Sequence, residues 1–284
     1  MKKVLVTGAN GQLAQCIRAA SPNYPSLEFT FLGKYDLDLE NEENLQEFFD
    51  SNTYDVCINT AAYTNVEKAE SERDKAFEVN ANAIRRLARI CDKKDVLLIH
   101  ISTDYVFDGT ASVPYMETDD NNPLNVYGAS KLEGERHIIQ NCKRYYIIRT
   151  SWLYSQYGHN FFNTILKYAS EGKALTITTE QTGTPTNAND LAEVLLIVAA
   201  SKLEKYGLYH FSNGGEASWF DFAEAILLET GQIKHTSLEK TDHYRTFAAR
   251  PKFSVLNCEK IKAQFGLNIL QWKESLRTII QPND

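Results

Sequence analysis

The chain has 284 residues, 43% of them hydrophobic and 24% charged, which excludes disordered, collagen-like and fibrous proteins. Thirty basic and 37 acidic residues give a net charge of −7, so the surface repels polyanions on average, and we expect neither a nucleic-acid polymer nor a membrane as partner. The longest mostly apolar stretch, residues 191–200, is shorter than the roughly 20 residues that span a bilayer, and the N-terminal apolar run is too short for a signal peptide, so we expect a cytoplasmic protein.

Short apolar runs rich in β-branched residues alternate with helix-length segments over the first half of the chain. Such continuous runs are typical of parallel strands covered on both faces. The sequence therefore predicts an α/β fold with a Rossmann-type doubly wound parallel sheet in residues 1–152. Strands are expected at 2–6, 27–32, 56–61, 96–102 and 145–151, and helices at 12–20, 41–51, 66–92 and 127–141.

Glycines divide the rest of the chain into shorter elements, which predicts a smaller, irregular second domain at 153–284 that mainly binds substrate. Helices are expected at 160–171, 190–204, 218–230 and 257–265. Asp190 is the expected N-cap of the second of these, Ser218 and Asp221 form a capping pair for the third, and Gly231 ends it. The strand at 207–212 is a candidate to return to the main sheet.

A glycine-rich turn follows the first strand, with the pattern Gly8-x-x-Gly11-x-x-Ala14. Glycines at a strand-to-helix turn let backbone N–H groups approach a pyrophosphate, which then lies at the positive end of the helix. The third position needs only a small residue for helix–strand packing, and Ala14 meets that need. The turn therefore predicts a dinucleotide site.

Lys34 follows the second strand, where an acid that binds the ribose 2′-hydroxyl is usual in this type of site. A cation there suits a 2′-phosphate. We therefore expect NADPH as the preferred cofactor, with NADH as the alternative. Asp36 and Asp38 come slightly later, where a carboxylate can face the adenine edge.

Tyr127 and Lys131 lie four residues apart in the segment YGASK, so on a helix they share one face. A nearby ammonium favours the phenolate and lowers the pKa of a tyrosine, which makes the pair suitable for acid–base chemistry on a carbonyl or alcohol. The strand at 96–102 delivers Thr103 and Asp104 at its carboxyl end, where ligands bind in open α/β sheets. Thr103 is thus expected to meet the same substrate oxygen as Tyr127.

These features together resemble the extended short-chain dehydrogenase/reductase family along essentially the whole chain. The matching segments outside and around the cofactor motif are VTGANGQLA near the start, INTAAYTNVEKAESE at 58–72, STDYVFDG at 102–109, PLNVYGASKLEGE at 123–135, RTSWLY at 149–154, QTGTPT at 181–186 and ARPKFSVLN at 249–257.

The resemblance implies NADPH-dependent reduction of the C4 keto group of dTDP-4-dehydro-β-L-rhamnose to dTDP-L-rhamnose, a precursor for polysaccharide. It implies that Tyr127 is the general acid, that Lys131 holds the nicotinamide ribose and tunes Tyr127, and that Thr103 bonds the substrate carbonyl. The expected substrate contacts also include Asp104, Trp152 and Arg250, the last at the diphosphate. With the residues of the glycine turn and Lys34, the expected cofactor lining is Gly8, Asn10, Gly11, Gln12, Leu13, Lys34, Asp38, Leu39, Ala62, Tyr63, Thr64, Tyr127 and Lys131.

Two positions depart from the family pattern. Ala14 stands where glycine is usual, and Cys16 stands where some relatives have an acid used in a metal-bridged dimer. Neither the histidines nor the five cysteines show a zinc spacing, so no metal-ligand residue is predicted, the need for Mg²⁺ stays open, and a homodimer is compatible with the sequence.

Two alternatives remain at this stage. One is another nucleotide-sugar 4-ketoreductase. The other is a non-catalytic regulatory subunit that resembles that of methionine adenosyltransferase; the complete set of Thr103, Tyr127 and Lys131 favours an enzyme.

Overall fold

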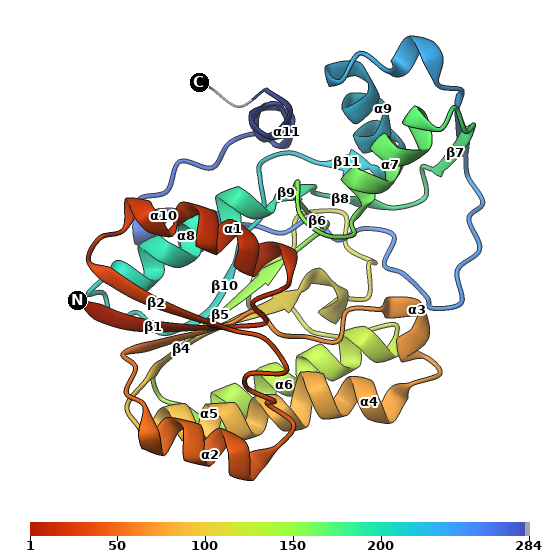
Figure 1. Cartoon of the computed structure of the whole chain (residues 1–284). Helices are drawn as coiled ribbons and strands as arrows, with labels where there is room; N and C mark the ends of the chain where they lie inside the picture. The colour runs from red at the N-terminus through yellow and green to blue at the C-terminus, as the bar shows by residue number, and fades with distance from the viewer. Residues whose placement is uncertain (282–284) are drawn as a thin grey trace.

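In a computed structural model, which describes residues 1–281, a six-stranded parallel sheet forms the centre of the molecule and confirms the predicted fold class (Figure 1). The last three residues of the predicted second domain lie outside the described residues. The strand order is β10-β5-β4-β3-β1-β2. The bounds are β1 (Lys2–Thr7), β2 (Leu27–Leu32), β3 (Val56–Asn59), β4 (Leu97–Thr103), β5 (Tyr145–Thr150) and β10 (Gly207–His210).

The apolar runs form strands because both faces of the sheet are covered. Val4 and Val6 of β1 pack on one side and Leu5 packs on the other, and all three are fully buried. Parallel strands buried in this way carry no polar alternation. The register pairs Val4 with Val56 and Tyr146 with Gly207, so β10 adds a sixth strand beside β5.

Helices cover the two faces of the sheet in two layers (Figure 1). One layer holds α1 (Gln12–Ala20), α8 (Ala188–Ala200) and α10 (Glu259–Phe265), and the opposite layer holds α2 (Glu42–Ser51), α5 (Ala83–Lys93) and α6 (Val126–Asn141). Residues from the second half of the chain therefore complete the sheet and one of its covers.

The single helix predicted at 66–92 is wrong. The structure divides it into α3 (Val66–Ala69), α4 (Arg73–Phe77), the π-helical turn η2 (Glu78–Asn82) and α5. The backbone leaves the helical conformation at Glu72. In this break Glu70 accepts a hydrogen bond from the Val126 N–H at 2.8 Å, so a tertiary contact with α6 is made where the helix stops.

A smaller lobe lies beyond the carboxyl edge of the sheet. It consists of α7 (Phe161–Ser170), α9 (Trp219–Glu229), α11 (Trp272–Ile280), the pair β7 (Leu175–Thr178) and β12 (Leu238–Thr241), and the short pairs β6 (Leu153–Tyr154) with β9 (Thr186–Asn187) and β8 (Thr182–Gly183) with β11 (Ala217–Ser218). Single 3₁₀ turns lie at η1 (Ser21–Asn23), η3 (Asp104–Val106) and η4 (Ile233–His235). The apolar core of the lobe includes Tyr154, Phe162, Phe222 and Trp272.

The capping box of Ser218 and Asp221 is present at α9, and Gly231 ends that helix with a left-handed φ of 71°, as predicted. The N-cap predicted at Asp190 is wrong, because Asn187 caps α8. The Asp190 carboxylate instead accepts hydrogen bonds from Asn213 and Ser275 at 2.6 Å each, which tie α8 to the lobe.

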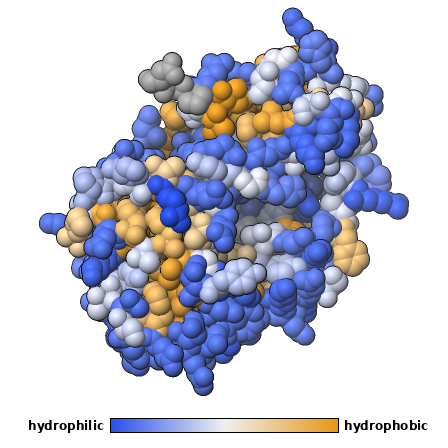
Figure 2. Space-filling view, in the orientation of Figure 1, coloured by the Kyte–Doolittle hydropathy of each residue, from blue (hydrophilic) through white to orange (hydrophobic). Residues whose placement is uncertain are grey.

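The face of the molecule in Figure 2 is mainly hydrophilic and is hollowed between the lobe and the sheet body. Four of the five cysteines are buried, and all five are free thiols. Within residues 1–281, every helix is too short or too polar to cross a membrane.

Candidate active site

Two connected cavities lie at the carboxyl edge of the sheet. The first, here the glycine pocket, has a volume of about 350 Å³ and is lined by Gly8, Gly33 and Tyr63 among others. The second, here the central cleft, has a volume of about 590 Å³ and is lined by Tyr127 and Trp152 among others. They share the residues Asn10, Gly11, Thr60 and Ala62. One extended ligand can therefore reach from one cavity into the other.

The glycine turn is built for close approach of a ligand to the backbone. Gly8 has a φ of 71°, and a Cβ there would lie 2.8 Å from the Ala61 nitrogen, so no side chain fits. Gly11 is the N-cap of α1 and supplies no side-chain bond to the first turn. The exposed N–H groups and the helix dipole suit a pyrophosphate, so the pocket fits the dinucleotide expected from the sequence.

Lys34 lies on the wall of the glycine pocket, with 62% of its side chain exposed, and forms an ion pair with Glu40. Asp38 accepts a hydrogen bond from the Glu40 N–H at 3.0 Å. An exposed ion pair of this kind contributes little to stability, so a phosphate can exchange with Glu40 at small cost.

Helix α6 approaches the end of β4 closely because Gly128 has no side chain. A Cβ at Gly128 would lie 2.1 Å from the Tyr105 carbonyl oxygen. Asn125 caps the helix by accepting a hydrogen bond from the Gly128 N–H at 2.8 Å. Tyr127 is thus held beside Thr103 and packs edge-on against the Tyr105 ring, with 5.8 Å between ring centres.

Burial raises the pKa of Tyr127 to about 12, while a hydrogen bond with Thr103 partly opposes the shift. The phenol is therefore protonated at neutral pH, which is the form that donates a proton. The expectation that Lys131 lowers this pKa is wrong for the protein alone, because burial dominates and the charge of Asp104 adds to the rise.

Lys131 is buried, and its Nζ donates to the Ile101 carbonyl at 2.7 Å and lies 3.3 Å from His100 Nε2. His100 Nδ1 lies 2.9 Å from the Asn59 amide nitrogen, and the Thr7 hydroxyl donates to Asn59 Oδ1 at 2.6 Å. Burial lowers the pKa of Lys131 to about 8 and holds that of His100 well below its usual value. A chain of polar groups within the sheet therefore fixes the position of the lysine.

A buried ion pair lies one helical turn beyond Lys131. Arg149 of β5 makes two hydrogen bonds to Glu135 of α6, at 2.9 and 2.6 Å, and their side chains are 1% and 2% exposed. The Arg149 guanidinium also lies over the Phe107 ring, 5.1 Å from its centre. Sequence reasoning missed this pair, although Glu135 shares the helix face of Lys131.

Trp152 follows β5 with a φ of 43°, a strained value for a residue with a side chain. Its ring stacks on Trp219 at 3.7 Å between centres, and a Cβ on Gly183 would lie 2.6 Å from it. Trp219 also lines the cleft and was missed, because only the fold brings α9 to the end of β5. The two rings give the cleft a flat apolar wall.

Nine buried polar side-chain atoms within residues 1–281 have no hydrogen-bond partner, and four of them belong to residues that line the central cleft. Because buried polar groups are nearly always paired, these atoms are available to bond a polar ligand or a bound water. The four atoms are Ser102 Oγ, Asp104 Oδ2, Thr150 Oγ1 and Arg250 Nε.

Every site residue predicted from the sequence lies on one of the two cavities except Asp36, whose carboxylate accepts a hydrogen bond from the Gly33 N–H at 2.9 Å. The individual roles stay predictions. The glycine pocket holds Gly8, Asn10, Gly11, Lys34, Asp38, Leu39, Ala62 and Tyr63. The central cleft holds Asn10, Gly11, Gln12, Leu13, Ala62, Thr64, Thr103, Asp104, Tyr127, Lys131, Trp152 and Arg250.

Replacing Asp104 with asparagine is expected to stabilise the protein at alkaline pH. Burial raises the pKa of this carboxyl from 3.8 to about 6, so the folded protein binds the proton more tightly than the unfolded chain. The charged form therefore costs stability above about pH 6, by about 3 kcal/mol, and the cost is relieved as pH falls toward about 4. Urea unfolding should give Asp104→Asn a higher free energy of unfolding than the native protein near pH 8 and an equal one near pH 4. Equal stability at both values would contradict the prediction.

Comparison with known proteins gives a consistent result over the full length. A family model described as the RmlD substrate binding domain matches residues 1–284. A dTDP-4-dehydrorhamnose reductase of Aggregatibacter actinomycetemcomitans is 38% identical over 291 residues, covering 98% of each chain. Among solved structures, a dTDP-4-dehydrorhamnose reductase of Clostridium acetobutylicum is 38% identical with a TM-score of 0.92, covering 98% of each chain. One from Bacillus anthracis, in complex with NADP, is 33% identical with a TM-score of 0.93, covering 99% of each. The chain therefore belongs to the dTDP-4-dehydrorhamnose reductase family of extended short-chain dehydrogenase/reductases.

Proposed function

We propose that the protein reduces the C4 keto group of dTDP-4-dehydro-β-L-rhamnose with NADPH to form dTDP-L-rhamnose. The observation that carries this proposal is the meeting of a protonated Tyr127, Thr103 and Lys131 in a cleft that continues from the glycine pocket. The dTDP-4-dehydrorhamnose reductases that match over nearly their full length give the substrate.

When bound, NADPH supplies the hydride for the carbonyl carbon. Tyr127 gives its phenolic proton to the oxygen of the substrate as negative charge develops there. Lys131, whose Nζ donates to the Ile101 carbonyl, lines the same cleft from the next turn of α6, and its positive charge stabilises the resulting phenolate. The Thr103 hydroxyl accepts from the Tyr105 N–H at 3.2 Å and donates to Asp104 Oδ1 at 3.1 Å. When the sugar binds, this hydroxyl turns to donate its proton to the substrate oxygen.

The sugar nucleotide is expected to lie between Asp104, Trp152 and Arg250. Asp104 Oδ2 and Arg250 Nε lack partners within the described residues. The Asp104 oxygen can therefore accept a hydrogen bond from a sugar hydroxyl, and the Arg250 N–H can donate one to the diphosphate.

We also propose that residues 1–152 hold the cofactor, that 153–284 mainly bind the sugar nucleotide, and that the protein acts in the cytoplasm. The five free thiols, which are typical of a reducing compartment, support that location. A homodimer remains a proposal of the same kind.

The function is tested by mixing the purified protein with NADPH and dTDP-4-dehydro-β-L-rhamnose generated in place, and by following the loss of NADPH absorbance and the sugar product. We expect turnover and formation of dTDP-L-rhamnose. Tight NADPH binding without turnover would contradict the proposal and favour the regulatory-subunit alternative. Turnover to a different sugar epimer would favour another 4-ketoreductase.

Removal of the Lys34 ammonium should reduce the preference for NADPH over NADH. In Lys34→Ala the 2′-phosphate loses its nearest expected cation, and we expect about a tenfold loss of NADPH affinity, since bonds to charged groups are among the stronger ones. The affinity for NADH should change little. Fluorescence titration with both cofactors checks this, and an equal loss for both would assign Lys34 to general stability of the pocket.

A further inference from the structure

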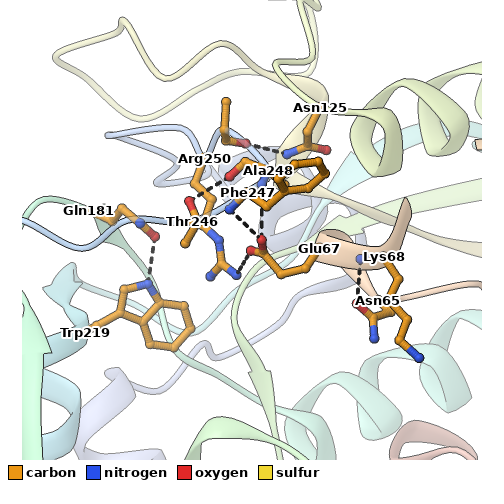
Figure 3. Close-up of polar contacts among 11 residues, drawn as sticks. Asn65, Glu67, Lys68, Asn125, Gln181, Trp219, Thr246, Phe247, Ala248 and Arg250 are labelled. Carbon is orange, nitrogen blue, oxygen red and sulfur yellow. Dashed lines mark hydrogen bonds and ion pairs between the residues drawn. The ribbon is translucent and has the colours of Figure 1, made fainter. Parts of the chain in front are cut away.

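Residues 246–250, here the crossing segment, run from the lobe to the sheet body outside any helix or strand and lie over α3 (Figure 3). One carboxylate on α3 takes three hydrogen bonds from this segment. Glu67 Oε2 accepts from the backbone N–H groups of Phe247 at 2.8 Å and Ala248 at 3.1 Å, and Oε1 accepts from Arg250 Nη2 at 2.8 Å.

A second contact fixes the crossing segment to α6. The side-chain amide of Asn125 donates to the Ala249 carbonyl at 2.8 Å, while its oxygen caps the helix that carries Tyr127. The large apolar side chain of the segment, Phe247, is 78% exposed. Polar contacts therefore hold the crossing segment against the sheet body, and burial of this aromatic ring contributes little.

The same contacts decide where the Arg250 guanidinium points. Arg250 lines the central cleft, and its Nη2 donates a hydrogen bond to Glu67. The buried Nε of Arg250 has no partner within the described residues. Burial raises the pKa of Glu67, but hydrogen bonds from Arg250 and from two backbone N–H groups outweigh this and lower it, so the carboxylate is charged. A positive group fixed in this way, with an unused donor, suits an anionic oxygen of a nucleoside diphosphate.

We propose that Glu67 is a positioning residue for the sugar nucleotide: it holds the crossing segment against α3 and thereby aims Arg250 into the cleft. This inference rests on the proposed function, because that function supplies the diphosphate. Glu67 does not touch the substrate in this scheme and acts through Arg250. Loss of its oxygens releases the segment, and the guanidinium is then no longer pre-organised for binding.

Binding of dTDP alone, measured by calorimetric titration, tests the proposal without catalysis. We expect Glu67→Ala to weaken dTDP binding about tenfold, as loss of a pre-organised charged hydrogen bond does. Glu67→Gln keeps one oxygen for the two backbone N–H groups, but its amide NH2 cannot accept from Arg250 Nη2, so this variant should recover only part of the affinity. The KM for the sugar nucleotide should follow the same order, while kcat and the KM for NADPH stay near their native values.

A double-mutant cycle shows whether Glu67 acts through Arg250. If it does, the double variant Glu67→Ala, Arg250→Ala binds dTDP no more weakly than Arg250→Ala alone. The control is Glu229→Gln, which loses a pair with Arg277 of the same 2.8 Å length. Neither residue lines the glycine pocket or the central cleft, so the dTDP affinity of this variant should not change.

Three results would overturn the inference: native dTDP affinity in Glu67→Ala, an equal loss in Glu67→Gln, or additive losses in the double variant. Failure of the proposed function is a separate outcome, in which the native protein itself neither binds dTDP nor turns over.

Discussion

Replacing Tyr127 with phenylalanine is expected to lower kcat by about 10²–10⁴-fold, the usual contribution of a positioned general acid. Burial keeps the phenol protonated, with its pKa raised to about 12, so the native protein holds the proton where the substrate oxygen develops charge. Phenylalanine keeps the ring contact with Tyr105 and removes only the hydroxyl. The NADPH dissociation constant should therefore remain within a few-fold of the native value.

Single-turnover measurements, together with NADPH titration, separate the chemical step from cofactor binding. Tyr24→Phe is a matched control, because it removes a hydroxyl that bonds Glu193 at 2.7 Å away from both cavities. Native turnover in Tyr127→Phe would show that another group donates the proton. A parallel loss of NADPH binding would show that the hydroxyl serves the cofactor.

The second large effect concerns stability, and we expect Arg149→Met to lower the free energy of unfolding by about 3–5 kcal/mol. The substitution leaves the Glu135 carboxylate buried without its cation, and it removes both hydrogen bonds of the pair. The contact between the Arg149 guanidinium and the Phe107 ring is also lost. Most of the loss comes from the charge left unpaired in the core.

Urea unfolding of the native protein, Arg149→Met and the double variant Glu135→Leu, Arg149→Met tests this explanation. The double variant removes both charges, so it should recover most of the lost stability. A double variant as unstable as the single one would instead show that the shape of the salt-bridged pair matters more than its charge. The surface control Glu133→Gln, which loses an exposed contact with Arg136, should change stability by less than about 1 kcal/mol.

Much of the sheet can be predicted from sequence because each strand is specified by residues that are adjacent in the chain. The continuous apolar runs around Val4–Val6 and Leu97–Ile99 are typical of parallel strands buried on both faces, and the glycine turn depends on a few adjacent residues. Tyr127 and Lys131 are found for the same reason, since the spacing of a helix places them on one face.

Features that depend on distant approaches could not be predicted in this way. Trp219 meets Trp152 only because Gly183 leaves room for the ring, and nothing in the sequence around α9 indicates it. Glu67 looks like an ordinary charged residue on a short helix until the crossing segment lies above it. The break in the expected helix at 66–92 likewise depends on the contact of Glu70 with Val126.

The late position of α8 and β10 in the chain has a consequence for protein synthesis. When residues 1–150 have left the ribosome, all five early strands exist, but the edge of β5 has no partner and the apolar face under α1 lacks α8. An open edge and an uncovered face are both prone to association. The nascent chain therefore needs protection until Gly207–His210 has emerged, and a gene fragment that encodes only the early strands should yield an insoluble product.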